Sequence, residues 1–203
     1  MRVTTPLDMT NRCERCFLPR TLCLCHALPS VVTRTRVVIL RHHKELWKVS
    51  NTARLAALAL PQAELHDYGG PDSRLDEVAL RAPGTFVLFP DGPEPSREPP
   101  AAEVRQLLVL DGSWPQARRM SQRMEVLRGL PRLVLPPPPP TSVRLRQPLR
   151  ADGMSTLEAI AGALELLEGP AVSGPLYALH ALSVARVLAS RGRPGQPWHP
   201  GTG

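Results

Sequence analysis

The chain has 203 residues, a hydrophobic fraction of 42% and a formal net charge of +7, which suits one globular domain with a substantial core. It has no apolar run of about 18 residues and no signal-peptide core, so we predict a cytoplasmic protein that does not span a membrane. With three Trp, two Tyr and three Phe, it lacks the aromatic side chains for an extended base-stacking platform.

The positive charge is concentrated in two parts of the chain. Residues 1–50 and residues 101–150 each contain nine Arg or Lys and three Asp or Glu, whereas residues 51–100 contain four basic and eight acidic residues. If the two basic segments share a face, that surface suits a phosphate backbone, which favours a nucleic-acid partner. The alternative is a set of ordinary solvated faces in an arginine-rich chain.

The four cysteines lie within thirteen residues of one another, in a segment that we expect to span residues 1–30: Cys13, Cys16, Cys23 and Cys25. In a cytosolic chain, such clustering favours a metal site over disulfides. Four thiolates are a common closed ligand set for structural zinc, and a Cys-x-x-Cys turn supplies two of them. The second pair has the tighter Cys-x-Cys spacing, so His26 is an alternative fourth ligand.

A short apolar run over residues 37–40 predicts a buried strand. Either Ser50 or Asn51 is the expected cap of the helix that follows, over residues 53–60. We expect the two adjacent histidines between this strand and this helix to point in different directions, and no third ligand lies at zinc spacing from them. We therefore interpret them as polar or structural residues and not as metal ligands.

Strands and helices are predicted to alternate along the chain, which implies a mainly parallel sheet flanked by helices. The predicted strands cover residues 37–40, 64–68, 85–89, 107–111 and 132–135. The predicted helices cover residues 53–60, 72–81, 115–128, 155–168 and 175–190. In the second of these helices, we expect Leu75, Val78 and Ala79 to face inward. Glycine and proline dominate residues 191–203, which we expect to be a disordered tail.

The apolar residues 107–110 have no polar alternation, which is typical of a strand buried on both faces. The polar Asp-Gly-Ser-Trp elbow of residues 111–114 follows, and ligands collect where the strands of a parallel sheet end. Ser113 and Gln116 have capping-box spacing, and Pro115 supports a helix start there. Taken by itself, this elbow is more simply explained as a turn, a cap and a core anchor.

Three separated motifs occur in a fixed order: His-x-x-Glu followed by Asn-Thr (His42, Glu45, Asn51 and Thr52), Asp-x-Ser-Trp (residues 111–114) and Ser-Thr-Leu-Glu-Ala (residues 155–159). Together with the cysteine-rich start and the arginines of residues 144–146, they resemble the DTW-domain family, tRNA-uridine aminocarboxypropyltransferases that use S-adenosylmethionine. The resemblance runs from about Cys13 to the last predicted helix. Ser113 replaces the threonine of the family signature and keeps its hydroxyl, and Val143 stands where the family commonly has a tyrosine.

The resemblance implies a SPOUT-like α/β fold with a C-terminal trefoil knot for residues 31–190, preceded by a small zinc knuckle. It also implies that the 3-amino-3-carboxypropyl group of S-adenosylmethionine is transferred to the ring imide nitrogen of a uridine in tRNA, with release of methylthioadenosine. We expect a monomer without a protein partner.

The resemblance further implies roles for individual residues. Asp111 is the expected base or proton acceptor, and a contact with the ammonium group of S-adenosylmethionine is its alternative role. The expected S-adenosylmethionine contacts are Pro90, Leu110, Ser113, Trp114, Leu135, Ser155 and Thr156. The expected tRNA contacts are His42, Lys44, Glu45, Lys48, Asn51, Thr52, Arg118, Arg119, Arg144 and Arg146.

Two other functions remain open at this point. One is a SPOUT-type RNA methyltransferase, because folds of that kind commonly transfer the methyl group. The other is a noncatalytic RNA-binding zinc protein, in which residues 111–114 form only a structural elbow.

Overall fold

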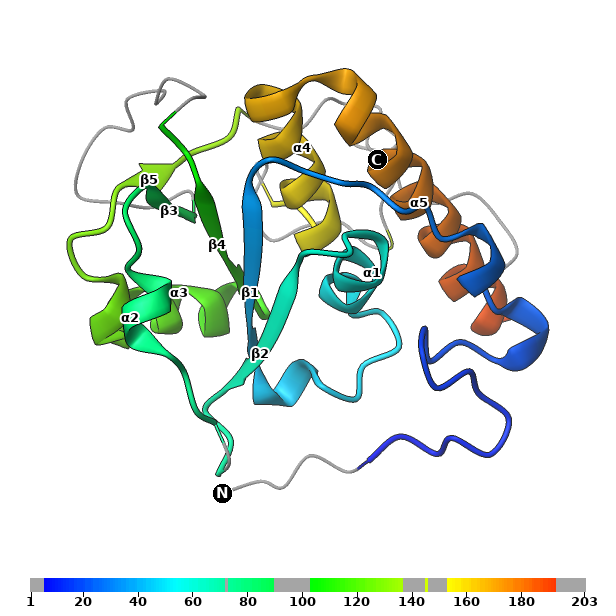
Figure 1. The fold of residues 1–203 in the computed structure, drawn as a ribbon. Helices are drawn as coiled ribbons and strands as arrows, with labels where there is room; N and C mark the ends of the chain where they lie inside the picture. Colours follow the sequence, from blue (N-terminus) through cyan, green and yellow to red (C-terminus); the bar gives the residue numbers. More distant parts are fainter. Residues whose placement is uncertain (1–5, 72, 90–102, 137–144, 146–152, 193–203) are drawn as a thin grey trace.

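Five parallel strands form the central sheet of the computed structural model, which describes residues 6–71, 73–89, 103–136, 145 and 153–192. The strands are β1 (Arg36–His42), β2 (Glu64–Tyr68), β3 (Thr85–Leu88), β4 (Gln106–Asp111) and β5 (Arg132–Leu133). Their order in the sheet is β2-β1-β4-β3-β5, and each neighbouring pair is parallel (Figure 1). The predicted parallel α/β sheet is therefore confirmed.

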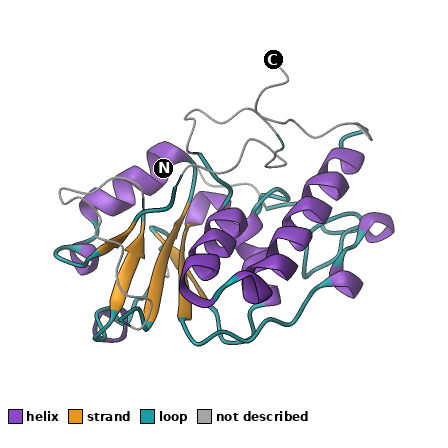
Figure 2. Cartoon of the chain, turned by 90° about the horizontal axis from the view of Figure 1, so that it is seen from above, coloured by secondary structure: helices purple, strands orange, loops and turns teal. Residues whose placement is uncertain are grey.

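Helices cover both faces of this sheet (Figures 1 and 2). The α-helices are α1 (Thr52–Ala59), α2 (Glu77–Leu80), α3 (Trp114–Arg123), α4 (Thr156–Glu168) and α5 (Pro170–Ser190). The short 3-10 turns are η1 (Arg20–Leu22), η2 (Cys25–Ala27), η3 (His43–Glu45) and η4 (Glu125–Leu127). Helices α1, α4 and α5 pack together on one face, and α2 and α3 lie on the other.

The alternation of side chains along the strands divides the core into two layers. Val37 and Ile39 of β1 pack with α1 and α4, whereas Val38 and Leu40 pack with α3. All six residues of β4 are buried, as expected for a central parallel strand that is covered on both faces. By the same alternation, Asp111 at the end of β4 lies on the face of α1 and α4.

The prediction of a helix over residues 72–81 is wrong in its extent, because α2 covers only Glu77–Leu80. Asp76 caps this single turn by accepting two backbone hydrogen bonds at 3.1 Å. Val78, which we expected to face inward, is 85% exposed, and Leu80 is the residue of this turn that enters the core. Val78 was assigned to the inner face because the helical period was applied to all of residues 72–81, although only Glu77–Leu80 form a helix.

The limits of two other helices also differ from the prediction. The extended backbone of Met124 ends α3 at Arg123 instead of residue 128. At its start, α5 reaches back to Pro170, directly after Gly169, whose φ of +94° separates it from α4. A proline in the first turn of a helix needs no N–H partner, so Pro170 begins α5 and the predicted start at residue 175 lies inside it.

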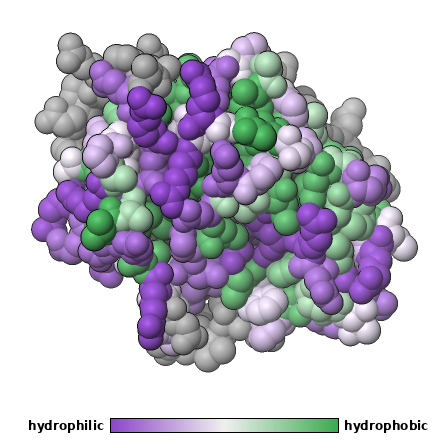
Figure 3. Space-filling view, viewed as in Figure 1, coloured by the Kyte–Doolittle hydropathy of each residue, from purple (hydrophilic) through white to green (hydrophobic). Residues whose placement is uncertain are grey.

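The helix α5 is long and apolar enough to span a membrane by length and composition, and 44% of its most apolar window is buried. Its buried residues Leu176, Leu179 and Val187 belong to the same core as α1 and α4. Figure 3 shows more apolar surface on the side of α4 and α5 than on the side of α2 and α3. The helix contains polar residues such as His180 and Arg186, so it is not a continuous apolar run, and its packing places one apolar face in the core.

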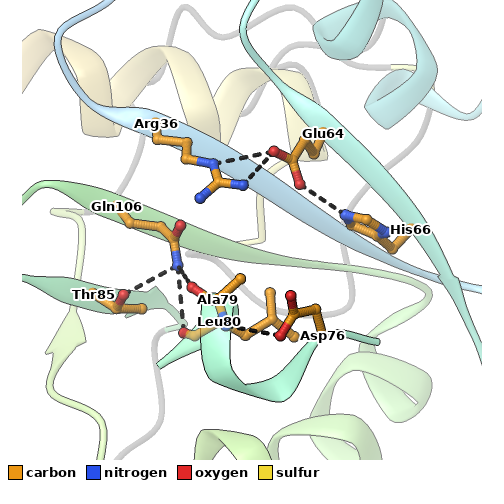
Figure 4. Close-up of polar contacts among 8 residues, drawn as sticks. All are labelled: Arg36, Glu64, His66, Asp76, Ala79, Leu80, Thr85 and Gln106. Atoms are coloured by element: carbon orange, nitrogen blue, oxygen red, sulfur yellow. Dashed lines mark hydrogen bonds and ion pairs between the residues drawn. The ribbon is translucent and has the colours of Figure 1, made fainter. Parts of the chain in front are cut away.

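At the amino end of the sheet, polar side chains bond to groups on neighbouring strands and turns (Figure 4). Gln106 begins β4, is 3% exposed, and donates to a backbone carbonyl of α2 at 3.0 Å and to Thr85 Oγ1 at 3.1 Å. Arg36 of β1 forms an ion pair with Glu64 of β2, and the other carboxylate oxygen of Glu64 lies 3.0 Å from His66 Nε2. These contacts connect adjacent strands at the start of the sheet.

Side chains of the cysteine-rich segment are part of the main core. Cys16, Leu18 and Leu24 are at most 2% exposed and pack in the cluster that contains α1, α4 and α5 residues. The division of the chain at residue 30 and the trefoil knot stay predictions. The predicted tail lies outside the described residues from residue 193 onward.

Candidate active site

The three sequence motifs meet at the carboxyl end of β4. Asp111 is the last residue of β4, Asn51 is the N-cap of α1 and Thr156 is the first residue of α4. Asn51 Nδ2 donates to Asp111 Oδ2 at 2.6 Å, and Thr156 Oγ1 donates to Asp111 Oδ1 at 2.5 Å. Segments that are 60 and 45 residues from Asp111 in the chain are therefore joined at one carboxylate.

A further contact joins the starts of α1 and α4 directly. The backbone N–H of Leu157 donates to Thr52 Oγ1 at 3.2 Å. Ser155 caps α4 in a capping box, since its Oγ accepts the N–H of Glu158 and its own N–H donates to the Glu158 carboxylate, each at 3.2 Å. Thr52 and Ser155 thus hold the two helix starts beside Asp111.

The carboxyl group of Asp111 is only 4% exposed. Burial raises the pKa of this group above its ordinary value, and the hydrogen bonds from Thr156 and Asn51 act in the opposite direction. A raised pKa makes a carboxylate a better proton acceptor at neutral pH. The same buried anion is also suited to holding a cationic group, so the geometry supports both roles that the sequence left open for Asp111.

The segment between β1 and α1 carries the His-x-x-Glu motif. Glu45 is buried and accepts a bond from Lys48 Nζ at 2.6 Å. His42 stacks on His43 with ring centroids 4.7 Å apart, so the expectation that these two side chains point in different directions is wrong. Nδ1 of His42 accepts the backbone N–H of Lys44 at 3.2 Å. Burial and the neighbouring His43 and Lys44 lower the pKa of His42, so its ring is neutral at pH 7 and carries its proton on Nε2.

Two arginines that sequence reasoning missed are buried next to this site. Arg41, 5% exposed, donates through Nε and Nη2 to Asp67 at 2.7 and 3.0 Å. Arg54 of α1, 7% exposed, donates to the backbone carbonyls of Leu46 and Lys48. Burial lowers the pKa of Arg54 to about 10, so its guanidinium stays charged at pH 7. The signal in the sequence was a single cation within the apolar helix of residues 53–60.

Ser113 and Trp114 lie where α3 begins. Ser113 is the N-cap of α3 and its N–H donates to Gln116 Oε1 at 2.6 Å, so the predicted capping box is confirmed. The half-buried indole of Trp114 stacks on Phe89, with ring centroids 5.5 Å apart and planes at 7°. Phe89, just after β3, is a neighbour of the elbow that the sequence did not predict.

The other predicted S-adenosylmethionine contacts lie in different surroundings. Leu110 is buried on the α3 side of the sheet, so its side chain does not share a face with Asp111. Leu135 packs on the α4 side, close to Gly162. Pro90 lies outside the described residues.

Four of the predicted tRNA-contacting cations are described, and all four are exposed: Lys44, Lys48, Arg118 and Arg119. Arg119 of α3 is close enough to His42 to contribute to its lowered pKa. Because Lys44 and Lys48 lie on the segment that follows His42, cations from α3 and from this segment flank the end of β1. Arg144 and Arg146 lie outside the described residues.

The four cysteine sulfurs lie within 4.8 Å of one another, with 3.6 Å between those of Cys13 and Cys25 and 3.8 Å between those of Cys16 and Cys23. A tetrahedral zinc with Zn–S bonds of about 2.3 Å requires S···S distances of roughly 3.8 Å, so the donor set fits this metal. The group of possible metal ligands found among the described residues consists of these four cysteines and does not include His26. The geometry therefore favours four thiolate ligands over the set with His26.

The thiols of this cluster differ in acidity. Burial opposes the ionisation of Cys13, but the N–H groups of Cys16 and Arg15 and the neighbouring thiols outweigh it and lower the pKa of Cys13 to about 6. Burial raises the pKa values of Cys16 and Cys25. The four thiols would hold a divalent cation as thiolates, and Cys13 would be the first to supply one.

These features define an α/β domain whose buried polar site lies at the carboxyl ends of parallel strands, where such folds bind ligands, beside a four-thiol cluster suited to a metal. The chain belongs to the DTW domain family, whose family model matches residues 10–188. The matched region includes the four cysteines and the three motifs that meet at Asp111.

Curated proteins from several eukaryotes are similar to the chain. It is 29% identical to tRNA-uridine aminocarboxypropyltransferase 2 of Drosophila melanogaster over 80% of this chain and 69% of that protein. It is 29% identical to tRNA-uridine aminocarboxypropyltransferase A of Arabidopsis thaliana, over 57% of this chain and 52% of that protein. It is 28% identical to tRNA-uridine aminocarboxypropyltransferase 2 of Macaca fascicularis, over 80% of this chain and 58% of that protein. The chain thus matches between about half and two thirds of the length of these relatives, and no solved structure is a significant match.

Proposed function

We propose that the chain transfers the 3-amino-3-carboxypropyl group of S-adenosylmethionine to the ring imide nitrogen of a uridine in tRNA. The observation that carries the proposal is the joining of three separated motifs at the carboxylate of Asp111. This arrangement occurs in a chain of the DTW domain family whose matched relatives are named tRNA-uridine aminocarboxypropyltransferases. The family membership and the geometry around Asp111 both support the proposal.

In this reaction the uridine nitrogen attacks the side-chain carbon next to the sulfonium. A C–N bond forms, the C–S bond breaks with its electron pair going to sulfur, and methylthioadenosine leaves. The positive sulfur already activates the leaving group, so the main tasks of the protein are to orient the two substrates and to accept the imide proton.

We assign the imide proton to Asp111, because it is the buried carboxylate with a raised pKa at this end of the sheet. Thr156 and Asn51 fix the orientation of its two oxygens. If Asp111 is the base, Asp111→Asn slows turnover by about a thousandfold and keeps the affinity for S-adenosylmethionine. Loss of that affinity would instead identify Asp111 as the partner of the ammonium group and contradict its role as base.

The side chains around Asp111 suit the polar and aromatic parts of S-adenosylmethionine. Trp114 is half-buried and offers ring surface to the adenine or to the methionine arm. Ser113 offers a hydroxyl to the carboxylate of the substrate. At the start of α4, Ser155 and Thr156 complete the set that we propose to contact this substrate.

Exposed cations beside the end of β1 suit the phosphates of tRNA, and they include Lys44, Lys48 and Arg119. Zinc held by the four cysteines has a structural role in this proposal. Because phosphate contacts release bound counterions, the affinity for tRNA should fall steeply as the salt concentration rises, and a flat response would contradict these contacts.

Mass spectrometry of tRNA incubated with the protein and S-adenosylmethionine tests the proposed function. The expected product is a uridine that carries the mass of an aminocarboxypropyl group, with an equal amount of methylthioadenosine. The mass of a methyl group would identify a methyltransferase. Unmodified tRNA that still binds the protein would identify a noncatalytic RNA-binding protein.

A further inference from the structure

Phe17, the residue after the second cysteine, contacts the segment that we call the active-site loop, residues 43–50. Its ring stacks on Trp47 of this loop, with centroids 5.8 Å apart and planes at 12°. The guanidinium carbon of Arg54 lies 3.5 Å from the centroid of the same ring. Arg54 also donates to two backbone carbonyls of the active-site loop. Phe17 therefore contacts the loop through Trp47 and contacts the arginine that holds its backbone.

The backbone of Phe17 is in a conformation that favours glycine. Its φ is +63°, and it is the one non-glycine residue with a positive φ in the described part of the chain. The cysteine turn imposes this conformation, since the N–H of Phe17 donates to the carbonyl of Cys13 at 2.8 Å and the N–H of Cys13 donates to the carbonyl of Leu18 at 2.9 Å. A large ring at a strained position needs a compensating contact, which Trp47 and Arg54 provide.

The contacts continue from Phe17 to the buried carboxylate. The backbone N–H of Arg54 donates to Asn51 Oδ1 at 3.0 Å, and Asn51 Nδ2 donates to Asp111 Oδ2 at 2.6 Å. On the other side, Phe17 directly follows Cys16, whose side chain is 2% exposed and lies in the main core. A movement of the cysteine turn therefore moves a ring that contacts both the active-site loop and Arg54.

We propose that Phe17 is a positioning residue through which metal binding at the four cysteines fixes the active-site loop. With the metal bound, the cysteine turn holds the ring of Phe17 against Trp47 and Arg54. Without the metal, the turn is released and the loop loses this support. The effect on tRNA rests on the proposed function, because Lys44 and Lys48 of the loop are its proposed phosphate contacts, whereas the response of the loop to metal does not.

The emission of Trp47 reports the loop directly. The chain has three tryptophans, so Trp114→Phe combined with Trp198→Phe leaves Trp47 as the single emitter. Zinc added to the reduced, metal-free protein should shift this emission and saturate at one zinc per chain. Competition with a chelator measures zinc binding independently of the emission.

Substitutions at Phe17 separate positioning from folding. Phe17→Gly removes the ring and relieves the positive φ, so it should fold and bind zinc with unchanged stoichiometry. The zinc response of Trp47 should be lost. In the chain that keeps all three tryptophans, Phe17→Gly should raise the KM for tRNA about tenfold with little change in kcat. Phe17→Tyr keeps the ring and should restore both properties.

Phe86→Leu is the matched control for Phe17→Leu, because Phe86 is also a half-buried phenylalanine but lies in β3, outside the site. Both changes should lower the unfolding temperature, and only Phe17→Leu should remove the zinc response of Trp47. An undiminished response in Phe17→Gly, or an equal loss in Phe86→Leu, overturns the proposal. If the unaltered protein transfers nothing to tRNA, the proposed function fails, and the zinc response of Trp47 still decides the role of Phe17.

Discussion

The two ends of the central sheet hold their polar groups in different ways. At the amino end, Gln106 and Thr85 bond to each other and to nearby turns, and the ion pair of Arg36 with Glu64 is half exposed (Figure 4). At the carboxyl end of the same strand β4, the carboxylate of Asp111 is removed from water and bonded by side chains of α1 and α4.

The difference separates a structural end from the end that we propose to be functional. The bonds at the amino end connect neighbouring strands, and breaking one removes local stability. At the carboxyl end, burial holds Asp111 at a raised pKa where three segments meet, which works against stability at neutral pH and is common at functional sites. Substitutions at the amino end should therefore lower stability without slowing transfer, whereas substitutions at the carboxyl end should slow transfer.

Metal removal should have the largest effect, and this effect should fall mainly on the carboxyl end. The cysteine turn packs into the core through Cys16 and holds Phe17 against the active-site loop. Chelation should lower the unfolding free energy by about 3 kcal/mol or more. Hydrogen exchange should show lost protection in residues 43–50 and retained protection around Thr85 and Gln106. Equal loss at both ends would contradict the special link between the metal and the loop.

Gln106→Ala should lower the unfolding free energy by about 2 kcal/mol, because a buried side chain that bonds both α2 and Thr85 is lost. Transfer per folded molecule should not change, since this residue lies at the other end of β4 from Asp111. Gln62→Ala, at an exposed glutamine, is the control and should change neither property. Chemical denaturation and initial transfer rates measure the two effects, and a loss of transfer in folded Gln106→Ala would break the comparison.

Thr156→Val and Thr85→Val remove one hydroxyl at each end of the sheet. Each change should lower the unfolding free energy by about 1 kcal/mol, because Thr156 donates to Asp111 and Thr85 donates to a backbone carbonyl at 2.6 Å. Only Thr156→Val should also slow transfer, by about tenfold, since it frees one oxygen of the carboxylate. Thr156→Ser should restore the rate, and equal rates in the two valine variants would show that the bond to Asp111 has no functional role.

Asp111 and Glu64 should give opposite pH dependences of stability. The folded-state pKa of Asp111 is raised by burial, so its contribution to stability is lost as pH rises from the ordinary value of 3.8 through the folded pKa. Hydrogen bonds from Arg36 and His66 lower the folded-state pKa of Glu64, so its contribution is present above the ordinary value of 4.5 and is lost as pH falls through the folded pKa.

The unfolding free energy at pH 7 minus that at pH 3 should therefore increase in Asp111→Asn and decrease in Glu64→Gln. The second change should be smaller than about 1 kcal/mol, because the side chain of Glu64 is 41% exposed and its ion pair is screened by solvent. Urea unfolding at both pH values measures these differences, and changes of the same sign would contradict the assigned pKa directions.

The sheet could be predicted from the sequence because its signals are local. A strand covered on both faces needs a continuous apolar run, which residues 37–40 and 107–110 provide. The N-caps Asn51 and Ser155 also depend on local sequence, since each side chain accepts a hydrogen bond from the backbone N–H three residues later. Local period failed at Val78, because the expected helix of residues 72–81 is reduced to the single turn Glu77–Leu80, in which Val78 is exposed.

The site could be predicted only as a set of motifs. Their meeting at Asp111 depends on sheet order and helix packing over separations of 60 and 45 residues. The contacts of Arg54 with Phe17 and of Arg41 with Asp67 likewise join segments whose proximity no local pattern encodes.

The rate of transfer by Asp111→Asn, measured by mass spectrometry of tRNA nucleosides under single-turnover conditions, tests the central claim most directly. Since the change removes the proton acceptor and keeps the shape of the side chain, we expect a folded protein that transfers about a thousandfold more slowly. A folded Asp111→Asn protein that transfers the aminocarboxypropyl group at the rate of the unaltered chain would contradict the assignment of the function to the carboxyl end of β4.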